Sequence, residues 1–328
     1  MLVTNREQDG TARIREATLQ NPEMEVHTLK KESNLMKITL ISSLSALALL
    51  TIATLPQPTV ANSNRTYNTS FPSPSKRVYV SYDQITEVIE KLTKSAKEAE
   101  ASKVQLFFND GATIAAGALT EKGKLTWNFT AATDSPYMVY KEAYGNDYEL
   151  KLEISTEGKS VVSSQNEFGA TFVAEKGKRY SVTLNNKGAE TFAGMAMFKL
   201  QDGLKHPLAS MLPAAKVMAK SVETSFGNGF GITPNTVTLL GMVIPPNKDY
   251  GRATSKAANW NTIATSDGKA GSIRLRVLDK NKKVLQEDNG EAVDCSCIFK
   301  NQVVEAGSIR ISNPGSKPVF VLSMGLSF

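Results

Sequence analysis

Few side chains in this sequence could carry catalysis. Only one of its two histidines, His206, lies beyond the first 35 residues, and there are two cysteines. Ser-His-Asp or Cys-His catalysis would have to use His206. It precedes Pro207 at an expected helix start, which favours an exposed residue. We therefore predict no catalytic residue. The alternative is a hydrolase that uses paired carboxylates, although the order of Asp and Glu shows no pair.

The two cysteines, Cys295 and Cys297, are separated by a single residue. In an extended strand their Cα atoms would lie about 6.6 Å apart, at the upper limit for a disulfide. We predict an intrachain disulfide, which requires a turn between them. Buried thiols, an interchain bridge and a metal site are the alternatives.

Four oxygen-bearing residues flank one expected hairpin: Asp279, Asn281, Asp288 and Asn289. The chemistry of turns accounts for them. A calcium ion bound by these oxygens is the alternative, and we predict no other cofactor.

Tyrosines gather in one short stretch. Tyr137, Tyr140 and Tyr144, with Tyr148 just after them, are four of the nine tyrosines. We interpret residues 135–144 as a loop inserted in the first half of the chain, and predict that these tyrosines bind a ligand. A large apolar face with a polar tip suits a protein or carbohydrate surface. The alternative is a loop that folds back over the end of a sandwich.

Two amphipathic helices are expected. Ser81 and Gln84 have the spacing of a capping box. Apolar residues at helical spacing follow, namely Ile85, Val88, Ile89, Leu92, Ala96 and Ala99. The second helix covers residues 207–222, with Pro213 predicting a kink or a late start. We expect each apolar stripe to pack on its own sandwich.

Between and after the helices the apolar residues alternate with period two, as in Leu125-Thr126-Trp127 and Leu150-Lys151-Leu152. Glycine- and asparagine-containing turns separate these runs. Such spacing predicts antiparallel sandwiches. The fold class is therefore mainly β: two tandem antiparallel β-sandwich domains, each preceded by one amphipathic helix.

The sequence also indicates an internal duplication. Residues 260–267 echo residues 127–134, including both tryptophans, Trp260 and Trp127. The strand at Ile273, Leu275 and Val277 echoes the one that begins at Leu150. We expect the copies to share one fold and both tryptophans to lie in the core.

The stretch from Ser272 continues with an Asp-Lys-Asn turn, Val284-Leu285, an Asp-Asn-Gly turn and a strand after Ala306-Gly307. It resembles the pre-peptidase C-terminal type of bacterial β-sandwich domain, and the first copy is similar to it more loosely. The added helices and the cysteine pair depart from that pattern. The resemblance implies a secreted, non-catalytic accessory module and implies no ligand.

The N-terminal region predicts export. Lys37 precedes an uncharged run over residues 38–55, and Thr59 and Ala61 suit cleavage before Asn62. A retained membrane anchor is the alternative. We divide the chain into a polar extension (1–35, which precedes the more natural start at Met36), a signal peptide (36–61), a linker (62–77) and two helix-plus-sandwich copies (78–202 and 203–328).

The net charge of +6 is spread along the predicted strands. No basic run with interleaved aromatics points to nucleic acid, so we expect none as a partner. We predict a secreted or periplasmic binding or structural module. A carboxylate-dependent hydrolase and a membrane-tethered surface protein are the alternatives.

Overall fold

A computed structural model describes residues 77–146, 148–164, 169–227, 229–254, 257–268, 271–289, 293–305 and 307–327. All of them belong to one compact unit. The predicted signal peptide and almost all of the linker lie outside these ranges. Within the ranges, neither helix combines the length and the apolar character that crossing a membrane requires.

The strands of each half belong to two sheets. Four of them join a central sheet that both halves share, and the other four form a smaller sheet. The first half contains β2 (Ala112–Leu119), β3 (Lys124–Thr130), β4 (Ser135–Ala143), β5 (Leu150–Thr156), β6 (Lys159–Ser164), β7 (Ala170–Ala174), β8 (Arg179–Asn186) and β9 (Thr191–Lys199). The second contains β11 (Leu239–Ile244), β12 (Lys248–Thr254), β13 (Ala257–Ser266), β14 (Arg274–Asp279), β15 (Val284–Asp288), β16 (Asp294–Val304), β17 (Gly307–Asn313) and β18 (Val319–Ser327). Two short strands, β1 (Val78–Val80) and β10 (Phe230–Ile232), pair with each other.

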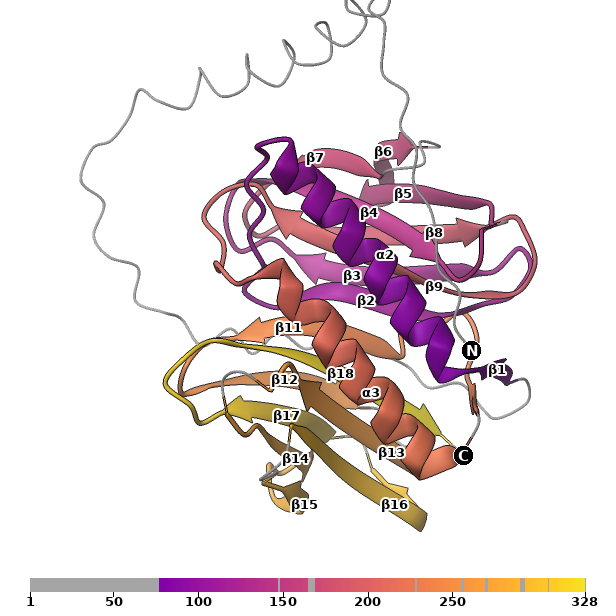
Figure 1. The fold of residues 1–328 in the computed structure, drawn as a ribbon, viewed down its shortest axis with the longest axis vertical. Helices are drawn as coiled ribbons and strands as arrows, with labels where there is room; N and C mark the ends of the chain where they lie inside the picture. The colour runs from indigo at the N-terminus through magenta and orange to yellow at the C-terminus, as the bar shows by residue number, and fades with distance from the viewer. Residues whose placement is uncertain are drawn as a thin grey trace, which may run out of the picture. The chain divides into compact units, whose positions relative to one another are not determined.

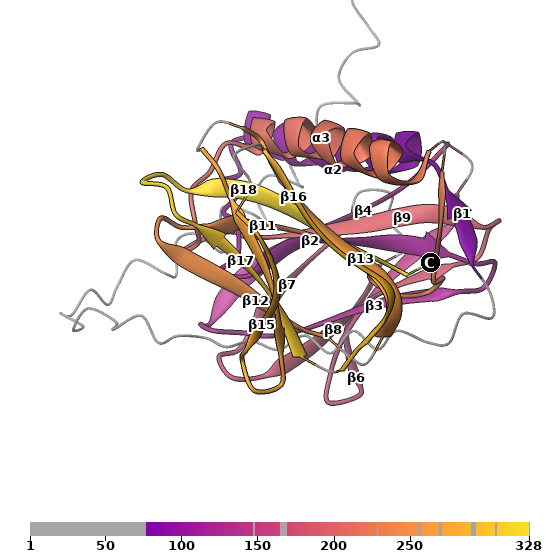
Figure 2. The ribbon, with the colours of Figure 1, turned by 90° about the horizontal axis from the view of Figure 1, so that it is seen from below.

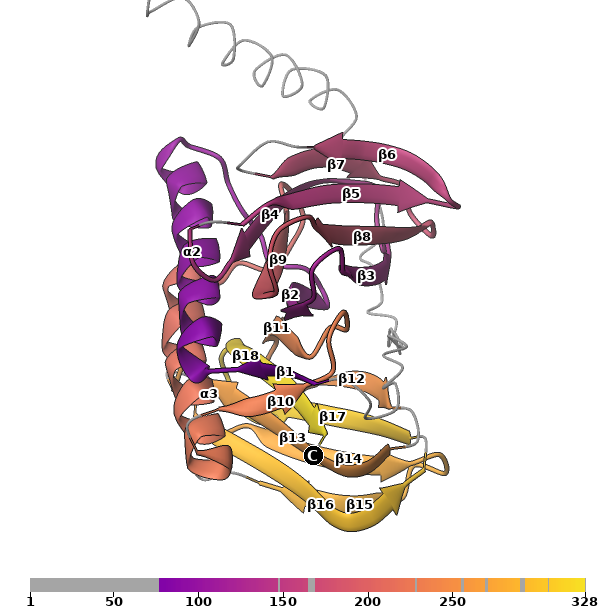
Figure 3. The same cartoon turned by 90° about the vertical axis from the view of Figure 1, so that its right-hand side faces the viewer.

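These elements, drawn in Figure 1 with the helices in front, form three layers that Figures 2 and 3 show edge-on. The middle layer is an eight-stranded sheet in the order β16-β13-β18-β11-β2-β9-β4-β7. The two helices cover one face. Two four-stranded sheets, β3-β8-β5-β6 and β12-β17-β14-β15, cover the other. Every strand pair is antiparallel, which confirms the predicted mainly-β class.

The strand order shows the duplication directly. Counted outward from the centre of the sheet, the first half contributes β2-β9-β4-β7 and the second half contributes β11-β18-β13-β16. Corresponding strands of the two halves therefore occupy corresponding positions. The halves meet where β2 pairs with β11, with Ile114 opposite Gly241. The central sheet therefore runs without interruption from one half into the other.

The expected correspondence between the two tryptophans is wrong. Trp127 lies on β3 of a smaller sheet, opposite Val182, whereas Trp260 lies on β13 of the central sheet. In the second half the position of Trp127 is taken by Arg252, opposite Ile309. Both tryptophans are nevertheless buried, as predicted. A buried tryptophan flanked by polar residues is compatible with a strand of either sheet. The short match between residues 127–134 and 260–267 therefore did not show which sheet each tryptophan belongs to.

Residues 135–144 are not an inserted loop. Ser135–Ala143 forms β4, which pairs with β9 on one side and β7 on the other. Tyr137 and Val139 point into the core, in the period-two pattern of a strand. Aligning the tryptophans left this strand without a counterpart, which is why it looked like an insertion; its counterpart is β13.

Both helices follow the sequence prediction. In α2 (Tyr82–Ala101) the backbone N of Ser81 donates to Gln84 Oε1 at 3.1 Å. A 3₁₀ turn, η1 (Leu208–Ser210), precedes α3 (Met211–Phe226), so Pro213 falls in the first helical turn and the start is late. Helix α2 packs on β4 and β9, and α3 on β13 and β18, each within its own half.

One glycine permits this close packing. A Cβ at Gly194 of β9 would lie 3.1 Å from Val88 Cγ1 of α2 and 3.0 Å from Ala116 Cβ of β2. A side chain at this position would push the helix away from the sheet.

Candidate functional site

The four predicted ligand-binding tyrosines do not form one surface. Tyr137 and Tyr140 are buried on opposite faces of β4, Tyr137 toward the smaller sheets and Tyr140 toward the helices. Tyr144 is exposed, and Tyr148 is half-buried in the connection to β5. Of the four, only Tyr148 lines a sizeable groove.

That groove, which we name the lysine groove, lies between α2 and the ends of β4 and β5. Its volume is about 630 Å³, within the range usual for ligand sites. It is lined by five lysines, three glutamates and four other residues: Lys91, Lys94, Ser95, Glu98, Lys141, Glu142, Asn146, Tyr148, Glu149, Leu150, Lys151 and Lys187.

The floor of the lysine groove is held by hydrogen bonds around Glu142. Its Oε2 accepts from the Tyr148 hydroxyl at 2.6 Å, and its Oε1 accepts from Ser95 Oγ at 2.9 Å. One carboxylate thus joins β4 to the helix and to the Tyr148 connection. This fixes the orientation of the tyrosine ring before any ligand arrives.

Lys91 closes one side of the floor. Its Nζ lies 2.8 Å from Glu87 Oε1, 3.1 Å from the carbonyl oxygen of Ala143 and 5.6 Å from the centre of the Tyr148 ring. The hydrogen bond from Lys91 lowers the pKa of the Glu87 carboxyl from its ordinary value. Lys141 is buried and donates to the carbonyl of Leu150. These two ammonium groups are already engaged.

The lysines at the rim of the lysine groove differ in their pairing from those on its floor. Lys94, Lys151 and Lys187 make no ion pair with any residue that the structure describes. Lys94 comes from α2, Lys151 from β5 and Lys187 from the turn after β8, so three separate elements present free ammonium groups to one groove. Sequence reasoning missed them because these lysines are far apart in the chain and each resembles an ordinary surface residue.

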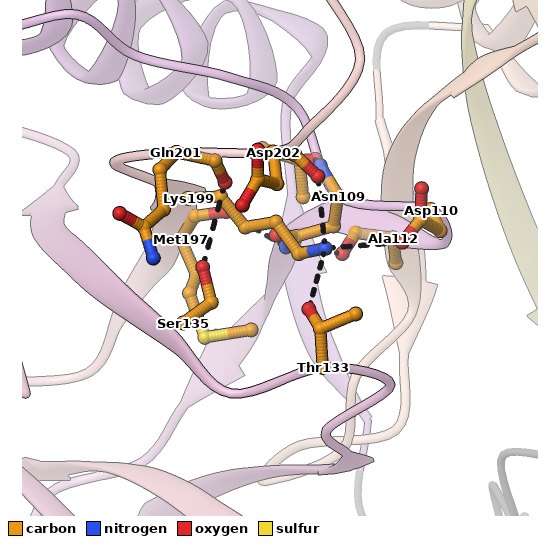
Figure 4. Close-up of polar contacts among 10 residues, drawn as sticks. Asn109, Asp110, Ala112, Thr133, Ser135, Met197, Lys199, Gln201 and Asp202 are labelled. Atoms are coloured by element: carbon orange, nitrogen blue, oxygen red, sulfur yellow. Dashed lines mark hydrogen bonds and ion pairs between the residues drawn. The ribbon is translucent and has the colours of Figure 1, made fainter. Parts of the chain in front are cut away.

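A second hollow, at the Ser135 end of β4, is too small for a ligand. It is lined by Tyr137 and Lys199 among others, and its volume of about 10 Å³ holds at most one water. The buried Lys199 Nζ pairs with Asp110 Oδ2 at 3.1 Å and donates to Thr133 Oγ1 and the Asp202 carbonyl, each at 3.3 Å (Figure 4). Lys199 therefore ties three loops together.

The predicted calcium ligands are not brought together. Asp279 Oδ1 accepts from the backbone N of Asn281 and of Lys283, each at 2.8 Å, which is turn chemistry. Asp288 lies opposite Leu275, four residues before Asp279, and so about 13 Å away along the hairpin. Asn289 is exposed beyond the strand end. The two ends of the hairpin cannot share one ion.

The cysteines are not joined. Cys295 and Cys297 are free, buried thiols on one face of β16, which contradicts the predicted disulfide. Both sit in regular pairs with β13, opposite Ala264 and Thr262, so no turn shortens the distance between them. Burial raises the pKa of each thiol to about 12.

His206 is not the exposed residue that the sequence suggested. Its side chain is 10% exposed, and its Nε2 lies 4.0 Å from Oδ2 of the buried Asp267. The ring also meets Phe108 edge-on, with 6.0 Å between the centres. The partner Asp267 directly follows β13, and no local pattern in the sequence links it to His206.

Neither a protein-family model nor a curated protein matches this sequence. Among solved structures, PliG from Aeromonas hydrophila, a periplasmic lysozyme inhibitor of g-type lysozyme, is 12% identical; the alignment covers 28% of this chain and 90% of that chain, with a TM-score of 0.24. AerE from Microcystis aeruginosa is 9% identical over 66% and 87% of the two chains, with a TM-score of 0.18. The CUB1-EGF-CUB2 domains of rat MASP-1 are 10% identical over 65% and 98%, with a TM-score of 0.19. Similarities this low carry no argument about function.

Proposed function

We propose that this protein is an extracytoplasmic, non-catalytic binding module and that the lysine groove binds an acidic segment of a partner protein. The observation behind the proposal is the rim: Lys94, Lys151 and Lys187 present unpaired charges around the fixed ring of Tyr148. Exposed charges of this kind steer an oppositely charged partner and set the register of binding.

The groove favours a protein segment over a uniform polyanion. Glu98 and Glu149 also belong to the lining, so an evenly spaced row of negative charges would meet repulsion from these two carboxylates. A peptide can place amides or lysines opposite the glutamates and carboxylates opposite the lysines. Tyr148 offers an aromatic face for an apolar side chain in between.

The test uses the purified full chain and a short fluorescein-labelled peptide rich in Asp and Glu. We expect binding that weakens as salt is added, because the rim charges are exposed to solvent. The triple variant K94A/K151A/K187A should bind about threefold to a hundredfold more weakly, since exposed ion pairs contribute about 0.2–1 kcal/mol each.

The matched control is K122A/K216A/K220A, which removes three exposed lysines outside the groove. It lowers the net charge equally and should leave the affinity unchanged. Equal loss in both variants would mean non-specific attraction. Equal affinity for an Asn/Gln version of the peptide, or tighter binding of oligogalacturonate than of the peptide, would refute an acidic protein segment as the ligand.

A further inference from the structure

Arg252 is a charged residue in an unusual position. It lies on β12 with a side chain that is 2% exposed. It stands opposite Ile309 of β17, and directly opposite residues of an antiparallel pair point the same way, so the guanidinium faces the core that contains Ile309. Its three nitrogens, Nε, Nη1 and Nη2, are all buried, and none has a hydrogen-bond partner among the residues that the structure describes.

The other buried cations of the described residues are satisfied. Lys199 has the carboxylate of Asp110 and two further acceptors, and Lys141 has the carbonyl of Leu150. Among the described residues, these two buried lysines are therefore paired, whereas the buried Arg252 is not.

An unpaired guanidinium in an apolar core is costly. Leaving a buried charge uncompensated destabilises a protein by several kcal/mol, and arginine cannot escape the cost by losing its proton at neutral pH. Burial lowers the pKa of Arg252 from its ordinary value, in keeping with this cost. A compensating negative charge is therefore expected to accompany it.

The core that contains Ile309 also holds buried donors. The indole nitrogens of Trp127 and Trp260 are buried without a hydrogen-bond partner among the residues that the structure describes, and both rings belong to the core between the central sheet and the two smaller sheets. The hydroxyl of Thr262, two residues from Trp260 on the same face of β13, likewise has no partner among the described residues. Tyr250, two residues before Arg252 on the same face of β12, offers a hydroxyl and not a carboxylate. A core with a cation and unused donors favours an anion that offers several acceptor atoms.

We infer that Arg252 binds a small carboxylate anion inside the second half of the protein. The planar fork of a guanidinium matches a carboxylate through two parallel hydrogen bonds, which gives both charge compensation and specificity. A single-charged, flat anion does this in the smallest volume.

The test follows binding and melting of the full chain in a buffer free of oxyanions, to which formate, acetate, phosphate or chloride is added. Calorimetry should detect formate or acetate binding to the unaltered protein. At one hundred times the Kd, the melting temperature should rise by about 5–10 °C. Phosphate binding more tightly than both carboxylates would assign the site to a different anion and overturn the choice of ligand.

Two variants locate the site. Arg252→Met removes the charge and should abolish the anion response while raising the melting temperature in anion-free buffer. Arg252→Lys keeps the charge but loses the fork, and should weaken binding about tenfold. The control Arg274→Met removes an exposed arginine of the same sheet and should respond to anions like the unaltered protein.

Calorimetry on the unaltered chain does not depend on any variant folding. No heat of binding with formate or acetate, or an undiminished anion response in Arg252→Lys and Arg252→Met, would overturn the inference. A melting temperature of Arg252→Met below that of the unaltered protein in anion-free buffer would show that the fold itself already compensates the guanidinium.

Discussion

Two buried asparagines, one in each half, make the same set of hydrogen bonds. The side-chain amide of Asn186 donates to two backbone carbonyls, and its Oδ1 accepts from the backbone N of Gly188 at 3.1 Å. Asn313 repeats the arrangement, with Gly315 as donor at 2.9 Å. The matching Asn-x-Gly turns were visible in the sequence, and they mark the duplication more faithfully than the tryptophans do.

Alanine at either asparagine should therefore destabilise the protein by about 2–3 kcal/mol, because each buried side chain makes three hydrogen bonds that alanine cannot replace. Denaturation in urea measures the loss. Asn185→Ala is the control, since that neighbouring amide is half-exposed and makes one long bond of 3.4 Å to Glu153. Equal losses at Asn185 and Asn186 would show that the turn geometry is held by the backbone instead.

The two tryptophans probe the same core from a smaller sheet and from the central sheet. Trp127 is 3% exposed and Trp260 is 2% exposed, and Trp260 stacks on Phe299 with 5.3 Å between the ring centres. Truncation to alanine should cost about 3–5 kcal/mol at each site. A cost well under that, with fluorescence already typical of exposed tryptophan in the native state, would contradict burial.

The buried thiols predict a response to alkali. Folding raises the pKa of Cys295 and of Cys297 from the ordinary 9.0 to about 12. Between these values the unfolded chain loses its protons first, so the free energy of unfolding falls as the pH rises above about 9. The double variant C295A/C297A should lose less stability between pH 9 and 11 than the unaltered protein. Rapid reaction of the native thiols with a thiol reagent at neutral pH would contradict their burial.

At the scale of elements, the spacing of apolar residues predicted whether a segment is a helix or a strand better than it predicted where a strand lies in the sheets. The cap at Ser81 and the late start of the second helix, which Pro213 indicated, were readable because caps and proline act locally. Strand β4 was not, because its membership of the central sheet depends on pairing with β9, more than fifty residues away. The lysine groove is assembled from α2, the ends of β4 and β5 and the turn after β8. These segments are far apart in the sequence, which is why only Tyr148 among its residues was indicated by the sequence.

The position of β4 gives a direct prediction. Replacing residues 135–144 by a short Gly/Ser turn should unfold the protein, because the change separates β7 from β9 and removes Tyr137 and Val139 from the core. Circular dichroism and melting report the result. The control replaces the exposed turn at Glu157-Gly158 by Gly-Gly, which should leave the melt nearly unchanged. A folded β4 replacement would restore the interpretation of this segment as a dispensable loop.

At the scale of the whole molecule, the two halves should unfold as one. Their sheets join through β2 and β11, and the core between the central and smaller sheets includes residues of both halves. A chain cut between Asp202 and Gly203 would expose an apolar strand edge on each fragment. We expect neither fragment to remain soluble alone and the two to recover a common melting transition when produced together. Independent melting of soluble fragments would show two separable domains.

The predicted location of the protein rests on residues 36–61, which we interpret as a signal peptide. Residues 38–55 carry no charge after Lys37, and Thr59 and Ala61 have the sizes that signal peptidase accepts. The proposed function depends on the predicted export, because only an exported protein would bring the lysine groove to extracytoplasmic partners. N-terminal sequencing of the exported protein should begin at Asn62, and Ala61→Leu should block cleavage because a large residue does not fit that position. Ala53→Leu, within the apolar run, is the control and should be processed normally. Recovery of the intact leader in the membrane fraction of the unaltered protein would establish the anchor instead, and the binding module would then act as a membrane-tethered surface protein.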